Sequence, residues 1–290
     1  MKRVAIIGSK GYIGKHLEWF LRRLDYHVES YDIMELNEDS YCQCNVSVRE
    51  QMKKINLNVD YLYMFAGKTG TKNGFDSYEE YITSNEIGLI NLLDAIRKSS
   101  YRPKVIFPSS RLIFKGQEKP LKEEDEKETK TIYAVNKLAC ENILYAYNNM
   151  YDIPYTIYRI CIPFGNMLAK DYSFGTIGFF IRQAKENGVI TLYGDGRNKR
   201  TFTSIGDLCR QIECSAIKDE SKNQIYNIGG TIYSLLDAAR EIASHYNAII
   251  KFVPYPESDL KIESGSTFFN STKLEAITGY TNYQKLDTLF

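Results

Sequence analysis

Three glycines at intervals of three residues, Gly8, Gly11 and Gly14, lie between an apolar run and an amphipathic segment. The run Val4–Ile7 has the character of a buried parallel strand, and Ile13–Leu24 places its apolar residues on one helical face. Such a chain must turn tightly between strand and helix, and glycine permits the close backbone approach that this turn needs. The turn's N–H groups and the helix N-terminus can hold a pyrophosphate. The sequence therefore predicts a strand–turn–helix unit that binds a dinucleotide.

The end of the next apolar run indicates which dinucleotide binds. Asp32 closes the run Val28–Asp32 and follows Gly14 by 18 residues. A carboxylate at this position binds both ribose hydroxyls of the adenosine and repels a 2′-phosphate. We therefore expect NAD, with NADP less favoured. Lys10 and Arg22 are nearby cations that would weaken this preference.

Strand-like runs alternate with helix-like segments through the first 165 residues. The runs are Val4–Ile7, Val28–Asp32, Tyr61–Phe65, Val105–Phe107 and Tyr155–Ile160, and the main helical segments are Ile13–Leu24, Tyr81–Lys98 and Thr131–Asn149. This alternation predicts right-handed strand–helix–strand units and an α/β fold, a Rossmann-type doubly wound parallel sheet. The charged run Gly116–Lys130 is expected to be a solvated loop that leads into the next helix.

The second half of the chain has a different pattern. The segment 161–178 is loop-like and rich in glycine; a helix at Phe179–Glu186, a strand at Ile225–Gly230 and an amphipathic helix at 234–246 follow. We expect residues 1–165 to form the dinucleotide-binding domain, with 201–230 returning to it. Residues 166–200 and 231–290 would then form a smaller mixed α/β substrate lobe.

Composition narrows the classes of partner. A net charge of +1 gives no reason to expect nucleic acid or an anionic membrane as a partner. No apolar run approaches the length of a membrane span, and the first apolar run is shorter than a signal peptide needs. The six cysteines lack the paired spacing of a zinc site, so we expect no metal. We expect these cysteines to be free thiols in a reducing compartment, and the protein to be cytoplasmic.

Tyr133 and Lys137 lie one helical turn apart and share a face of the predicted helix. Ser110 is expected at the end of the preceding strand. Oxidation of an alcohol needs a base for the hydroxyl proton, and a tyrosine with a lowered pKa can serve. A lysine ammonium and a positive nicotinamide ring would lower that pKa. The alternative interpretation is an interfacial tyrosine and a solvated lysine.

Taken together, these residues resemble the extended short-chain dehydrogenase/reductase family, in its NAD-dependent epimerase/dehydratase branch, which acts mainly on nucleotide-diphosphate sugars. The resemblance covers nearly the whole chain. It rests on the glycine motif, Asp32, "NV" (Asn45–Val46), "FAG" (Phe65–Gly67), Asn85, "FPSS" (Phe107–Ser110), "YAVNK" (Tyr133–Lys137), "YRICIPFGN" (Tyr158–Asn166), "YGDGRNKRTFTSIGDL" (Tyr193–Leu208) and "YNIGG" (Tyr226–Gly230).

The resemblance implies a role for each matching residue. Ser110, Tyr133 and Lys137 would be catalytic. The cofactor would contact Gly8, Gly11, Tyr12, Ile13, Gly14, Asp32, Ile33, Asn45, Val46, Phe65, Ala66, Gly67 and Asn85, together with Tyr133 and Lys137. The substrate would contact Lys68, Arg111, Asn166, Tyr193 and Arg200, with Arg200 on the diphosphate. The family also suggests a homodimer formed by the helices around 81–98 and 131–149.

One departure from the family pattern bears on the reaction. Dehydratases carry an Asp-Glu pair directly after the catalytic hydroxyl residue, where this chain has Arg111 and Leu112. Arg111 either meets a negatively charged group of the substrate or forms a buried structural pair with a carboxylate. The leading hypothesis is a nucleotide-sugar epimerase that works through a 4-keto intermediate. The alternatives are an NAD(P)H-dependent reductase of a 4-keto-deoxysugar nucleotide and a catalytically silent dinucleotide-binding sensor.

Overall fold

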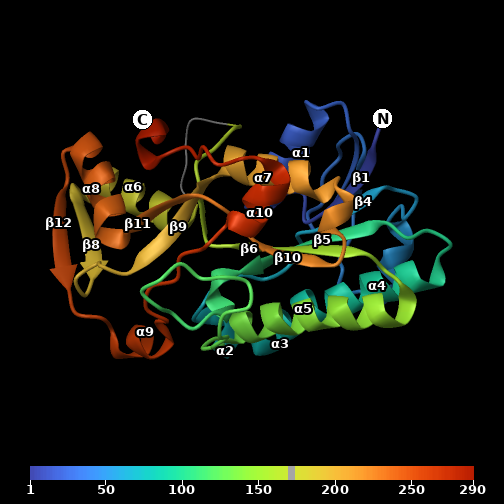
Figure 1. Ribbon diagram of the computed structural model, residues 1–290, viewed down its shortest axis with the longest axis horizontal. Coiled ribbons are helices and arrows are strands. Elements are labelled where there is room, and N and C mark those ends of the chain that lie inside the picture. The colour runs from blue at the N-terminus through green and yellow to red at the C-terminus, as the bar shows by residue number, and fades with distance from the viewer. Residues whose placement is uncertain (169–173) are drawn as a thin grey trace.

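The computed structural model describes residues 1–168 and 174–290. A parallel seven-stranded sheet forms its larger part, in the order β10-β6-β5-β4-β1-β2-β3 (Figure 1). The strands are β1 (Arg3–Ile7), β2 (His27–Asp32), β3 (Tyr41–Gln43), β4 (Tyr61–Met64), β5 (Lys104–Ser110), β6 (Tyr155–Ile160) and β10 (Gln224–Asn227). The predicted doubly wound α/β fold is confirmed.

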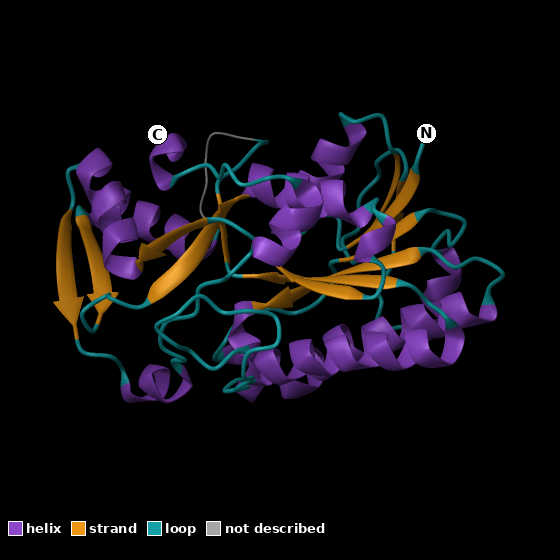
Figure 2. Cartoon of the chain, in the orientation of Figure 1, coloured by secondary structure: helices purple, strands orange, loops and turns teal. Residues whose placement is uncertain are grey.

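Helices cover both faces of this sheet, which explains why its strands read as continuous apolar runs. One face carries α1 (Tyr12–Arg22), α7 (Ile205–Ala216) and α10 (Thr272–Thr278); the other carries α4 (Gly88–Lys98) and α5 (Ile132–Tyr151) (Figures 1 and 2). Two separate apolar cores result, one on each side of the strands. The chain crosses from one half of the sheet to the other between β3 and β4, so the crevice at the carboxyl ends of β1 and β4 is the expected ligand site.

The helical segment predicted at Tyr81–Lys98 is not a single α-helix. It consists of α3 (Tyr78–Ile82), a π-helical turn at Thr83–Ile87, and α4. π-Helical turns inside helices are frequent at functional sites. Here the turn carries Asn85, which is buried and faces the loop that follows β4. The prediction of one helix assumed an uninterrupted period of 3.6 residues per turn, which the wider π-helical turn does not follow.

The smaller part of the molecule lies beyond the carboxyl edge of the sheet (Figure 2). A three-stranded sheet joins β7 (Ile162–Phe164), β9 (Lys199–Ser204) and β11 (Thr231–Ser234), and a two-stranded sheet joins β8 (Val189–Tyr193) and β12 (Ile249–Val253). Their core also contains α6 (Gly175–Asn187) and α8 (Leu235–Tyr246). The short helices α2 (Asn73–Asp76) and α9 (Glu257–Ile262) complete the α-helical elements of the described residues.

Three expectations for the loops and the second half need correction. Residues 162–164 form strand β7, and α6 begins four residues before the predicted Phe179; residues 169–173 of the expected loop lie outside the described part. Within Gly116–Lys130, Leu121 is fully buried and its carbonyl accepts a hydrogen bond from Asn227 Nδ2. That run therefore docks on the main sheet as well as facing solvent. The domain boundaries stay a prediction: α7 and β10 join the main sheet, whereas β9 pairs with β7 and β11.

Candidate active site

Three cavities adjoin along the carboxyl ends of the parallel strands. The first, of about 330 Å³, and the second, of about 470 Å³, are both lined by Gly8, Gly11, Phe65 and Gly67. The second and a third, of about 400 Å³, are both lined by Arg111, Leu112, Ile162 and Thr176. The cavities thus form one track from the β2 edge of the sheet to the smaller lobe. Such a track suits two extended ligands that meet in the middle.

The glycine loop fits the dinucleotide role that its spacing predicts. A Cβ on Gly8, whose φ is +87°, would lie 2.4 Å from the backbone nitrogen of Ala66. A Cβ on Gly14 would lie 2.1 Å from the carbonyl oxygen of Gly8. Both positions therefore exclude larger residues, because strand β4 and the turn itself occupy the space. Tyr12 and Ile13 follow in the first turn of α1, and both line the second cavity.

The first cavity contains the residues predicted to bind the adenosine. It is lined by Asp32, Ile33, Asn45, Val46, Ala66 and Lys68. Asp32 Oδ2 accepts a hydrogen bond of 2.9 Å from the backbone N–H of Lys10, which fixes the carboxylate beside the glycine loop. Asn45 Oδ1 accepts the backbone N–H of Ser47 at 3.0 Å, so this amide shapes its own turn.

The two cations that would weaken the preference for NAD are both paired. Lys10 Nζ lies 2.6 Å from Glu38 Oε2, and the guanidinium of Arg22 lies 3.0 Å from Glu18 Oε1. A 2′-phosphate would have to compete with these carboxylates and would also face Asp32. The charges around this cavity therefore favour a free ribose 2′-hydroxyl.

Asn85 holds the loop after β4 in position. Its Oδ1 accepts the backbone N–H of Lys68 at 2.9 Å, and its Nδ2 donates to the carbonyl of the same residue at 3.2 Å. Any side chain at Gly67 would collide with this amide, since a Cβ there would lie 2.3 Å from Asn85 Oδ1. Lys68 turns outward and pairs with Glu80 at 2.8 Å. It lines the first cavity, and its predicted contact with the substrate stays a prediction.

The second cavity brings Ser110, Tyr133 and Lys137 together. Ser110 ends β5, and Thr131 caps helix α5: its hydroxyl oxygen accepts a hydrogen bond of 3.1 Å from the backbone N–H of Ala134. This cap places Tyr133 in the first turn, with its phenol hydrogen-bonded to Ser110. Ser110 Oγ also accepts a hydrogen bond of 3.2 Å from the backbone N–H of Leu112, so its hydroxyl group can donate to the phenol oxygen of Tyr133.

Burial dominates the electrostatics of this group. It raises the pKa of Tyr133 to about 12, although the hydrogen bond with Ser110 acts in the opposite direction. It also lowers the pKa of Lys137 to about 8. The protein's own groups therefore do not produce the lowered tyrosine pKa that the sequence suggests. The physical reason is that Lys137 Nζ donates to the carbonyl of Pro108 at 2.7 Å, while the Tyr133 ring centroid is 5.7 Å away.

A buried ion pair beneath this group was not found by sequence reasoning. Glu141, one turn after Lys137, pairs with Arg159 of β6 at 2.7 Å. Its Oε1 also accepts a hydrogen bond of 2.5 Å from the hydroxyl group of Ser109. The pair ties helix α5 to the ends of both β5 and β6. The sequence offered one indication of this pair: Tyr133, Lys137 and Glu141 follow one another at intervals of four residues, so Glu141 lies on the same helical face as the residues predicted to be catalytic.

The third cavity contains three of the residues predicted to bind the substrate: Arg111, Tyr193 and Arg200. Tyr193 lies beside Tyr255, with 5.6 Å between their ring centroids, and Arg200 lies near them. Arg200 is only 1% exposed. Its guanidinium donates to the carbonyls of Lys199 and Gly265 and pairs with Glu263 at 2.8 Å. Most of its hydrogen-bonding capacity is thus used within the protein, and its diphosphate contact stays a prediction.

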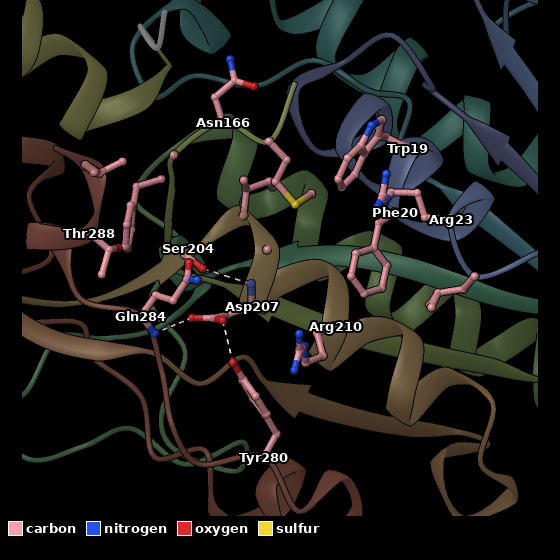
Figure 3. Close-up of a pocket in the computed structure, with 17 residues that line it drawn as sticks. Trp19, Phe20, Arg23, Asn166, Ser204, Asp207, Arg210, Tyr280, Gln284 and Thr288 are labelled. Atoms are coloured by element: carbon pink, nitrogen blue, oxygen red, sulfur yellow. Dashed lines mark hydrogen bonds between the residues drawn. The ribbon is translucent and has the colours of Figure 1, made fainter. Parts of the chain in front are cut away.

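Asn166 lies elsewhere. It lines a fourth cavity, of about 570 Å³, between α1, α7 and the C-terminal segment (Figure 3). Its Oδ1 accepts the backbone N–H of Leu168 at 2.8 Å and lies 2.9 Å from His16 Nε2. In the same cavity Asp207 accepts hydrogen bonds from Tyr280 Oη and the backbone N–H of Gln284, both at 2.7 Å (Figure 3). A direct contact between Asn166 and the substrate stays a prediction.

Comparison with known proteins agrees with this arrangement. Residues 4–229 match the NAD dependent epimerase/dehydratase family. The chain belongs to this family. NAD is accordingly its cofactor, and the glycine loop, Asp32 and the loop after β4 fit it. Within the described residues, no helix combines the length and the apolar character needed to cross a membrane.

Several relatives are similar over most of their length. The chain is 27% identical to a UDP-N-acetyl-alpha-D-glucosaminuronate decarboxylase of Bacillus cytotoxicus, covering 88% of this chain and 84% of the relative. It is 25% identical to a UDP-glucuronate 4-epimerase of Thermodesulfobacterium geofontis, covering 78% and 74%. The solved UDP-glucuronic acid 4-epimerase of Bacillus cereus superposes with a TM-score of 0.81 at 21% identity, covering 99% and 96%. This last likeness establishes the fold.

The carboxylate of Asp32 should determine the choice between NAD and NADP. We expect Asp32→Ala to weaken NAD binding by about 10- to 100-fold, because charge-assisted hydrogen bonds to the ribose are lost. NADP binding should strengthen, since the repulsion of its phosphate is removed. Calorimetric titration of both dinucleotides measures this, with Asp39→Ala, an exposed carboxylate of the same loop, as the control. Unchanged affinities in the Asp32 variant would contradict the assignment.

Proposed function

We propose that this protein is a nucleotide-sugar 4-epimerase that keeps NAD bound and acts through a transient 4-keto sugar. The observation that carries this proposal is that Ser110, Tyr133 and Lys137 all line the second cavity. This cavity lies between the first cavity, which fits the adenosine, and the third cavity, in the smaller lobe. An oxidant on one side and a sugar nucleotide on the other would meet at these hydroxyl groups. The similarity to epimerases and to a uronate decarboxylase supports the same class of chemistry.

The protein's own residues would handle the proton in this reaction. When bound, NAD supplies the hydride acceptor and a positively charged ring that favours the tyrosine anion. Tyr133 then takes the proton of the sugar's C4 hydroxyl, and Ser110 holds that oxygen in place by donating a hydrogen bond to it. Each pKa unit corresponds to about 1.36 kcal/mol, so lowering the Tyr133 pKa from about 12 toward 7 needs about 7 kcal/mol from its surroundings.

Lys137 would contribute mainly by orientation and by its field. Its ammonium is fixed by the Pro108 carbonyl and lies 4.5 Å from the centroid of the Phe107 ring. At neutral pH it remains mostly charged with a pKa of about 8. A fixed cation in a water-poor cavity stabilises a nearby anion more strongly than one in solution.

The third cavity would hold the nucleotide diphosphate. Tyr193 and Tyr255 present two aromatic rings to it, which suits the flat face of a nucleobase. Arg200 would approach the diphosphate with the donors that Glu263 and the carbonyls leave free. The sugar would then lie where the second and third cavities join. There the 4-keto intermediate would present its other face before reduction.

We also propose that the protein is a cytoplasmic homodimer of carbohydrate biosynthesis. The described cysteines are all unpaired, as expected in a reducing compartment. Exposed apolar side chains occur on the helices predicted to form the interface: Tyr78, Ile82, Ile87, Val135 and Tyr145. A twofold contact between these helices would bury them.

The epimerase reaction can be tested directly. We expect denatured protein to release NAD, and native protein to interconvert a UDP-sugar and its 4-epimer without added cofactor, as followed by NMR. Tyr133→Phe should retain NAD and lose at least about 1,000-fold in turnover, because the proton acceptor is gone. Full turnover by this variant would contradict the mechanism. Stoichiometric consumption of added NADPH with a keto-sugar would instead indicate a reductase.

The dimer can be tested by light scattering at micromolar concentration. Wild-type protein should have twice the mass of one chain, and Val135→Lys should reduce that mass to one chain by burying a charge in the interface. Ile249→Lys, an exposed apolar position on β12 that lies away from these helices, is the matched control. A monomeric wild-type protein would exclude the proposed assembly.

A further inference from the structure

The side chain of Arg111 carries a charge that no carboxylate of the described residues balances directly. Its one recorded side-chain hydrogen bond goes from Nη1 to the neutral hydroxyl of Thr267, at 2.9 Å. The alternative raised by the sequence, a buried structural pair with a carboxylate, is thus not formed in the described chain. Arg111 is partly buried, so its charge has lost part of its hydration and no carboxylate replaces it; an anionic ligand would supply the missing counter-charge.

Arg111 lies where the sugar of the proposed substrate must lie. It directly follows Ser110, and it lines both the cavity with Tyr133 and Lys137 and the cavity with Tyr193 and Arg200. Phe179 and Leu192 contribute apolar side chains to the lining of the cavity with Tyr193 and Arg200. Its guanidinium therefore faces the passage between the reacting centre and the nucleotide cavity.

The neighbouring charges leave one positive charge in excess. Arg200 is the other cation that acts on Arg111, and Glu263 is the nearby anion. Glu263 Oε1 is already engaged by Arg200 and by the backbone N–H of Gly265, at 2.8 and 3.0 Å. Burial and the repulsion by Arg200 lower the pKa of Arg111 to about 10, which still leaves it charged at neutral pH. One further anion would balance the group.

We propose that Arg111 binds a carboxylate on the sugar itself, and that the substrate is therefore a nucleotide-linked uronic acid. This inference rests on the proposed function, because it uses the placement of the reacting carbon at Ser110. In a hexuronic acid the carboxylate is carried on C5, next to the reacting C4. A residue adjacent to Ser110 is thus placed to reach it, and the planar guanidinium matches a carboxylate with two parallel hydrogen bonds.

The diphosphate is the other anion of such a substrate, but it is attached at C1, across the ring from C4. With C4 at Ser110, the diphosphate lies toward the far cavity, where Arg200 is the cation. The two arginines would therefore divide the substrate's charges between them. Arg111 would distinguish acidic from neutral sugars, whereas Arg200 would contribute equally to both.

Ligand affinity tests this division by a readout that does not depend on the rate of turnover. Protein with bound NAD is titrated by calorimetry with UDP-glucuronate, UDP-glucose and UDP. We expect wild-type protein to bind UDP-glucuronate about 10- to 100-fold more tightly than UDP-glucose, as a charged hydrogen-bonded pair should give. Arg111→Met should remove this difference and change the affinity for UDP-glucose by less than about threefold. Arg111→Lys should keep part of it, because the charge remains without the planar fork.

Arg197→Met is the matched control, since this exposed arginine belongs to the turn before Arg200 and lies outside the described cavity linings. It should leave all three affinities unchanged. Equal affinity of wild-type protein for the acidic and neutral sugars would overturn the proposal, and this outcome needs no variant. An equal loss for all three ligands in Arg111→Met would also overturn it, by assigning Arg111 to the diphosphate. If uronate selectivity is found but no epimerisation follows, the proposed reaction fails and this assignment stands.

Discussion

The contact between helix α5 and the carboxyl end of strand β5 determines the geometry on which the whole site depends. Lys137 Nζ reaches the carbonyl of Pro108, and Glu141, one turn later, joins the hydroxyl of Ser109 to Arg159 of β6. These bonds are buried, and breaking a buried pair by removing one partner costs about 3–5 kcal/mol. They hold the first turn of α5 against the strand end, so that Tyr133 meets Ser110.

The contact between helix α5 and strand β5 also changes the pKa values of the site residues. It removes several ionisable groups from part of their contact with water, which raises the pKa of Tyr133 and lowers those of Lys137 and Arg111. Each shift disfavours the charged form that the proposed chemistry uses. Ligands that bring a positive nicotinamide ring to Tyr133 and an anion to Arg111 would reverse this imbalance. In the protein alone, the charges of Tyr133 and Arg111 thus lack balancing charges, and the cofactor and the substrate would supply them.

Much of this arrangement could be predicted from sequence because the decisive features are local. Gly8, Gly11 and Gly14 follow a strand, Asp32 ends the next, and Tyr133 and Lys137 share a helical face; each is a short-range pattern with a direct physical reading. The strands of the main sheet were correspondingly well placed, except that the short edge strand β3 was not predicted. The features that could not be predicted depend on residues far apart in the chain. Glu263 occupies the guanidinium of Arg200 across 63 residues, and Asn166 turns into a cavity formed with α1 and the C-terminal segment. The π-helical turn at Asn85 was missed because the prediction assumed a uniform helical period through this segment.

The central claim is that hydride leaves and returns to the same carbon within one closed site, between a fixed Tyr133 and a bound NAD. The most direct test is to supply a UDP-sugar with deuterium at C4 together with an equal amount of substrate that has ordinary hydrogen at C4 and a mass label elsewhere. The account predicts that deuterium remains at C4 of both epimers, without loss to water or transfer between molecules. Loss of the deuterium to solvent, or its transfer through free NADH to the substrate that began with ordinary hydrogen, would contradict it.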